Sequence, residues 1–91
     1  MEKTILNYAR VLQSVAIRWQ CLRLAELAKD MQMATIDRKD KKLSEVDKLV
    51  GSPYRAITEH KQESSRPDLF ESEATFVLCQ IQYELELLNA A

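Results

Sequence analysis

Residues that break regular structure are scarce in this chain, which has one Gly and two Pro among its 91 residues. An all-β fold needs a turn every few residues, and Gly and Pro supply many of those turns. Their scarcity argues against an all-β fold and favours an all-α one. Ninety-one residues make a single domain, 1–91, with a small core.

Residues that commonly carry catalysis or bind metals are also scarce, with one His and two Cys. His60 stands alone in a polar segment, so it cannot form a metal site, and no neighbouring Ser or Cys makes a nucleophile pair with it. Cys21 and Cys79 lack the spacing of a metal or redox motif, and no Gly-rich loop is present to bind phosphate. We therefore expect no metal, no cofactor and no enzymatic activity.

Long apolar runs are missing as well. No stretch approaches the roughly 18–20 apolar residues that span a bilayer, and the first residues lack the pattern of a signal peptide. Both cysteines lie in apolar neighbourhoods, where a free Cys behaves as a small hydrophobic residue. We expect no membrane association and a reducing, cytoplasmic setting.

Charge is nearly balanced overall, at −1, but it is unevenly distributed. All thirteen Lys and Arg residues precede Pro67, whereas five of the fourteen acids follow it. Those five are Asp68, Glu71, Glu73, Glu84 and Glu86. The chain is dipolar, with an acidic last segment, and the net charge gives no indication of a nucleic-acid partner.

The stretch from Thr4 to Met33 contains neither Gly nor Pro, and we predict one long helix there. Its apolar residues form two rows: Ile5, Tyr8, Leu12, Val15, Trp19 and Leu22 in one, and Leu6, Ile17, Leu24, Leu27 and Met31 in the other. A surface helix needs only one such row, so two rows predict packing on two sides. Trp19 is expected to be largely buried with its indole N–H hydrogen-bonded.

The rest of the chain supplies the packing partners. A charged connection is predicted over Thr35–Lys42, and a short amphipathic helix follows it. Gly51 is expected to end that helix and Pro53 to start another short one. Pro67 opens a long last helix, again with two apolar rows. Short connections favour antiparallel neighbours, so we predict a small helical bundle with long, short, short and long helices, in which the first and last helices pack together.

Two apolar rows on each long helix exceed what a 91-residue monomer can cover. Because contiguous exposed apolar patches usually mark interfaces, we expect a homo-oligomer or a tight complex with another protein. The expected interface comprises Leu69, Phe76, Tyr83 and Leu87 on the last helix with Leu6, Ile17 and Leu24 on the first.

Acidic and amide side chains separate the two apolar rows of the last helix. Glu84 and Glu86 lie near its C-terminus, where the helix dipole disfavours acids, and neither has a base three or four residues away. Either they pair within the chain, with Arg23 or the Lys cluster of residues 39–42, which requires parallel first and last helices, or they dock a basic partner. The candidate partner-binding residues are Glu73, Gln80, Glu84, Glu86 and Arg23.

Two further classes of function remain open. Residues 24–31 read like the first helix of a helix-turn-helix, with Ala34–Arg38 as the recognition helix, although Gln32 or Met33 stands where the turn Gly is expected. The basic cluster after it is interleaved with acids, which is typical of a solvated loop.

In length and layout the chain is similar to small all-helical chorismate mutases. The similarity covers layout only, and it implies a bundle enzyme with charged and amide side chains gathered inside. The residue types it requires are present as Arg10, Arg18, Arg23, Gln80 and Glu84.

The function that the sequence favours is that of a small protein–protein interaction module. Such a module binds a larger macromolecular partner, as an inhibitor, immunity protein, chaperone or regulator does.

Overall fold

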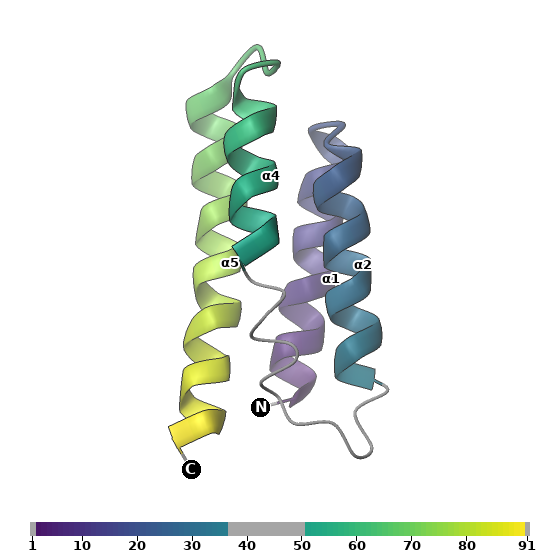
Figure 1. Ribbon diagram of the computed structural model, residues 1–91, viewed down its shortest axis with the longest axis vertical. Coiled ribbons are helices and arrows are strands. Elements are labelled where there is room, and N and C mark those ends of the chain that lie inside the picture. Colours follow the sequence, from purple (N-terminus) through teal and green to yellow (C-terminus); the bar gives the residue numbers. More distant parts are fainter. Residues whose placement is uncertain (1, 37–50, 91) are drawn as a thin grey trace.

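The computed structural model describes the backbone of residues 2–36 and 51–90, and the side chains of residues 3–36 and 51–87. These residues form four helices and no strand (Figure 1): α1 Glu2–Arg18, α2 Leu22–Ile36, α4 Gly51–Lys61 and α5 Pro67–Ala90. The predicted all-α bundle is confirmed. None of the described helices is long and apolar enough to cross a membrane.

The four helices form two antiparallel hairpins that pack side by side (Figure 1). The first hairpin is α1 with α2, and the second is α4 with α5. α1 packs most extensively against α2 and also along α5, while α2 contacts α4. The first and last helices therefore pack together as predicted, and they run antiparallel.

The prediction of one helix over Thr4–Met33 is wrong, because the chain reverses just after Arg18. The Cys21 N–H donates to the carbonyl of Ala16 at 2.8 Å, and the Gln20 N–H donates to the carbonyl of Ile17 at 3.0 Å. This pair of hydrogen bonds is a Schellman motif, which ends a helix with one residue in the left-handed conformation. Here that residue is Gln20, with φ of 59°.

The reversal changes how the apolar residues of this stretch are used, because the later members of the second row, from Leu24 to Met31, lie on α2 and not on α1. Leu12 of α1 and Leu24 and Met31 of α2 are all fully buried in one core. The first row ends at the turn, and Leu22 is 75% exposed. Three small residues, namely Ala9, Ala16 and Ala28, are fully buried in the same core.

The second hairpin closes the core from the other side. One row of α5 is buried as predicted, and its described members are Phe70, Ala74, Val77, Ile81 and Leu85. From α4, Ala56 and Ile57 are buried against them. An ion pair of 2.7 Å between Lys61 and Glu71 joins the end of α4 to the start of α5.

Some predicted boundaries shift. α2 continues three residues past Met33, and α4 begins at Gly51, two residues before Pro53. The charged connection from residue 37 onward and the short helix expected before Gly51 lie outside the described residues.

Replacing Gln20 with Gly should raise the free energy of unfolding by up to about 1 kcal/mol, because a β-carbon is disfavoured at this φ. Val at the same position should lower it by about 1 kcal/mol or more, since a β-branched side chain tolerates the left-handed region least. Urea denaturation followed by circular dichroism measures both changes.

Lys29→Gly is the matched control, because Lys29 is exposed in the middle of α2. There Gly should cost about 0.5–1 kcal/mol. Equal losses for Gln20→Gly and Lys29→Gly would contradict the assignment of strain to Gln20.

Candidate interaction surface

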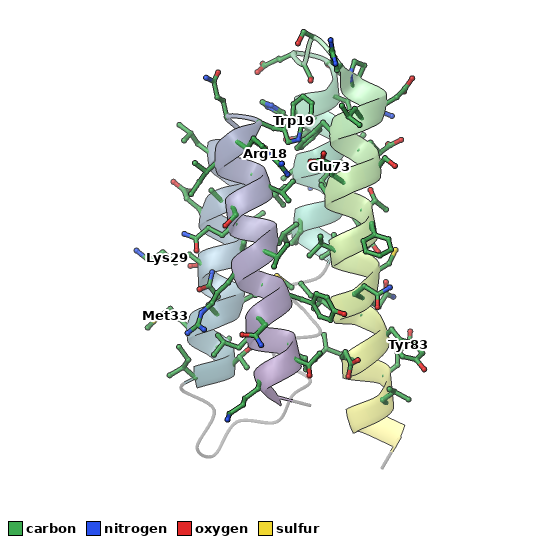
Figure 2. The ribbon with its side chains drawn as sticks, turned by 180° about the vertical axis from the view of Figure 1, so that it is seen from behind. Arg18, Trp19, Lys29, Met33, Glu73 and Tyr83 are labelled. Carbon is green, nitrogen blue, oxygen red and sulfur yellow. The ribbon has the colours of Figure 1, made fainter. Side chains whose placement is uncertain are left out.

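Four large apolar side chains form an exposed row on α5: Leu69, Phe76, Tyr83 and Leu87, which are between 38% and 65% exposed. We call them the α5 row. Their spacings of seven, seven and four residues place them on one face of the helix, opposite the buried row. Figure 2 shows Tyr83 pointing away from the bundle. The surface that the sequence predicted to remain uncovered is therefore present on the folded chain.

Carboxylates flank the α5 row on both sides. Helical spacing puts Glu73 and Glu84 along one edge and Asp68 and Glu86 along the other. Glu84 is half-buried and Glu86 is exposed. Neither forms an ion pair or a hydrogen bond with another described residue. Because residues 67–87 contain no base, this face of α5 combines an apolar centre with acidic edges.

Glu73 differs from the other acids because it is bound within the chain. Its Oε2 accepts hydrogen bonds from Arg18 Nη2 at 2.8 Å and from the indole Nε1 of Trp19 at 2.9 Å (Figure 2). The donors stand at the C-terminal end of α1, so this carboxylate ties α1 to α5. Of the candidate partner-binding residues, Glu73 thus already has an intramolecular role.

Trp19 occupies the junction between the two hairpins. Its hydrogen-bonded indole N–H confirms that part of the prediction, but the ring is only partly buried. The ring packs edge to face on Phe70, with centroids 6.0 Å apart. The carbonyl of Trp19 lies 3.0 Å from Nε2 of His60, which gives this carbonyl at the end of α1 a polar partner.

Arg23 lies far from the acids with which it was grouped. It stands in the first turn of α2 and pairs with Glu26 at 3.7 Å, both side chains being exposed. That turn is at the end of the bundle where α5 begins (Figure 1), whereas Glu84 lies roughly 25 Å further along α5 at 1.5 Å per residue. The proposed pairing of Arg23 with Glu84 or Glu86 is wrong, since α1 and α5 are antiparallel. The Lys cluster of residues 39–42 lies outside the described residues.

The expected interface residues of the first helix fall in different places. Leu24 is fully buried in the core, so its assignment to an oligomer interface is wrong. The reason is the reversal at Gln20, which turns this part of the chain inward. Ile17 is 60% exposed and Leu6 is half-buried.

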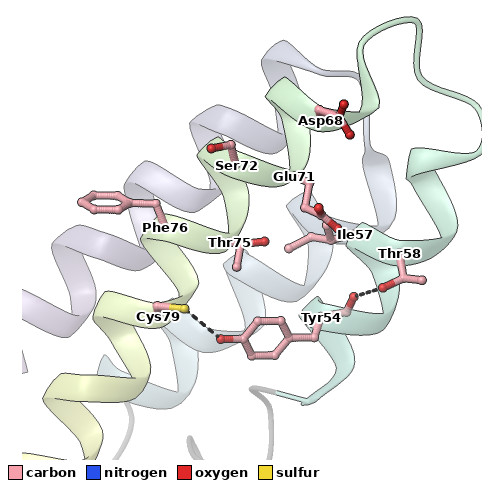
Figure 3. A pocket seen from close by; sticks show the side chains of 9 residues that line it. All are labelled: Tyr54, Ile57, Thr58, Asp68, Glu71, Ser72, Thr75, Phe76 and Cys79. Atoms are coloured by element: carbon pink, nitrogen blue, oxygen red, sulfur yellow. Dashed lines mark hydrogen bonds between the residues drawn. The ribbon is translucent and has the colours of Figure 1, made fainter.

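A groove between α4 and α5 borders the α5 row (Figure 3), and it was not predicted from the sequence. Its volume is about 700 Å³, and Ile57, Thr75 and Phe76 are among its lining residues. At one end the Tyr54 hydroxyl donates to Gln82 Oε1 at 3.1 Å and lies 3.4 Å from the Cys79 thiol. Only the packing of two helices creates this groove, so no local sequence signal marks it.

The structure does not support the two other classes of function in the form the sequence suggested. Gln32 and Met33 lie inside α2, so the turn of a helix-turn-helix is absent there. Arg10, Arg18 and Arg23 are exposed, so they do not gather inside the bundle as the layout similarity to chorismate mutases implied. Among the described residues, the only buried polar side chain is Thr35, which donates to the carbonyl of Met31.

Comparison with protein-family models, with curated proteins and with solved structures finds no match for this chain. Within the described ranges, no group of three or more His, Cys, Asp or Glu side chains is placed to hold a metal ion. What the described surface offers is an apolar row with acidic edges and an adjoining groove.

Glu73→Ala should lower the free energy of unfolding by about 1.5–3 kcal/mol, because it removes the charged acceptor of the indole N–H. Arg18→Ala should cost less than about 1 kcal/mol, since an exposed ion pair contributes little. Chemical denaturation followed by Trp19 emission measures both. Glu86→Ala on the same helix is the control and should stay within about 0.5 kcal/mol of wild type. Equal losses for Glu73→Ala and Glu86→Ala would show that the junction does not depend on this carboxylate.

Burial and, to a smaller extent, the contact with the Cys79 thiol raise the pKa of Tyr54 from 10.0 to about 12. The raised pKa favours the neutral hydroxyl in the folded state. Its stabilising contribution is therefore fully present below pH 10 and is lost as the pH rises through about 12.

An ultraviolet titration of phenolate absorbance tests this assignment. The late-titrating component should vanish in Tyr54→Phe, and Cys79→Ala should lower its pKa only partly, because burial is the larger cause. Circular dichroism at each pH shows whether the protein is still folded, and only titration points from folded protein are used. A component that persists in Tyr54→Phe would refute the assignment.

Proposed function

We propose that this protein is a small helical interaction module that acts by binding a larger macromolecular partner through the α5 row. The observation that carries the proposal is the exposure of four large apolar side chains on one face of the longest described helix. The opposite face of the same helix already fills the core. Large exposed apolar patches on a small protein usually mark an interaction site.

The size of the α5 row fits a binding surface. Full burial of a large apolar side chain contributes about 1.5–3 kcal/mol. These four are about half exposed, so covering them all contributes roughly 3–6 kcal/mol. That amount supports a transient contact, and polar contacts at the acidic edges add to it.

The way the bundle holds α5 also supports the proposal. Buried side chains anchor the helix along its inner face, and Glu73 ties it to the end of α1. A surface presented on a rigid helix loses little conformational entropy on binding, which favours affinity. Inhibitors, immunity proteins, chaperones and small regulators all use such surfaces. Since Cys21 and Cys79 are free thiols, we place this activity in the reducing environment of the cytoplasm.

The double variant Phe76→Ser/Tyr83→Ser should remain folded, because both side chains are exposed, and should lose at least about tenfold in affinity for the partner, in line with the apolar surface it removes. The partner is first captured from the native host with wild-type protein. It is then purified, and binding is measured by titration calorimetry with each variant.

Leu22→Ser/Met33→Ser is the matched control, because these two α2 side chains are also large, apolar and exposed. Figure 2 shows Met33 on the opposite side of the bundle from Tyr83. This control should bind like wild type. If the control loses affinity and the α5 variant does not, the α5 row is not the binding surface.

A further inference from the structure

The α5 row has acidic side chains on both of its edges, and this arrangement restricts what can cover it. Building on the proposed function, we infer that the partner presents one amphipathic helix with Lys or Arg on both sides of its apolar stripe. That basic helix lies along α5, with its stripe on the α5 row.

The shape of the row matches a helix. Leu69, Phe76 and Tyr83 repeat every seven residues, which is the spacing of one of the two contact positions of a coiled-coil heptad. The second contact position, four residues further on, is apolar at Leu87 and polar at Glu73 and Gln80. From Leu69 to Leu87 the row extends over roughly 27 Å at 1.5 Å per residue, or five helical turns. The groove beside Phe76 adds room for one large side chain of the partner (Figure 3).

The charges on the edges disfavour α5 of a second copy as the occupant. In an antiparallel pair of α5 helices, Glu84 and Glu86 of one copy approach Asp68 and Glu73 of the other. In a parallel pair, opposite edges of the two helices meet, so Glu73 and Glu84 of one copy approach Asp68 and Glu86 of the other. Both arrangements oppose like charges across the contact, which is unfavourable.

A basic helix satisfies the same acids. Asp68, Glu84 and Glu86 form no ion pair with another described residue, and Glu84 is half-buried beside the row. Lys and Arg side chains lay their methylene groups over apolar surface while their charges reach outward. Lys and Arg side chains of the partner helix therefore cover the edges of the α5 row and pair with these carboxylates. Such pairs speed association and make it sensitive to salt.

The test uses two synthetic three-heptad peptides with Leu at the contact positions. One carries Lys at the flanking positions and the other carries Glu. The Lys peptide should bind at least about tenfold more tightly at low salt, and the difference should shrink as salt screens the charges. A third peptide with the composition of the Lys peptide in shuffled order controls for general attraction to an acidic chain and should bind weakly.

Two double variants show which acids the Lys peptide binds. Glu84→Gln/Glu86→Gln should weaken Lys-peptide binding about three- to tenfold and reduce its salt dependence. Glu26→Gln/Asp30→Asn is the matched control, because it removes from α2 two exposed acids that are four residues apart. This control should leave binding unchanged. Circular dichroism verifies that every variant is folded.

Failure of the inference is distinguishable from failure of the proposed function. The inference is overturned if the Lys peptide does not bind, or if it binds no more tightly than the Glu peptide. It is also overturned if both acid variants weaken Lys-peptide binding equally. Each of these results leaves the α5 row available to another partner. A dimer that Phe76→Ser/Tyr83→Ser dissociates also overturns it, because a second copy then covers the row. Undiminished binding of the native partner by Phe76→Ser/Tyr83→Ser overturns the proposed function itself.

Discussion

The reversal of the chain between α1 and α2 allows apolar side chains from both helices to fill one core. It depends on Gln20 in the left-handed conformation and on two hydrogen bonds that end α1. Without this turn, Leu12 and Leu24 would lie far apart on one rod. With it, Leu24 and Met31 fold back beside α1 and leave one side of α1 for α5.

The burial of the inner row of α5 is what leaves its outer row exposed. A helix packed on one side by α1 and α4 has no neighbour on the opposite face within the described residues. The acids sit at the borders of that face, where Glu73 binds Arg18 and Trp19 and the others form no ion pair with another described residue. One face of α5 thus fills the core, and the opposite face is an exposed apolar row with acidic edges.

The sequence predicted those features that depend on local pattern. Helix content followed from the lack of Gly and Pro, and the exposed row of α5 followed from residue spacing. The turn at Gln20 was missed because this position usually carries Gly or Asn, and the misplacement of Leu24 followed from that error. The groove between α4 and α5 was missed because it exists only once two helices pack.

Polar side-chain contacts between the two hairpins gather at one end of the described bundle. There Glu73 binds Arg18 and Trp19, and His60 contacts the Trp19 carbonyl. Toward the chain termini, the described side chains that are buried in the core are apolar, such as Ile5 and Leu85. Local opening should therefore require less free energy near the termini than at the Trp19 end. Backbone amides in the last turns of α5 would therefore exchange with solvent sooner than those near Glu73.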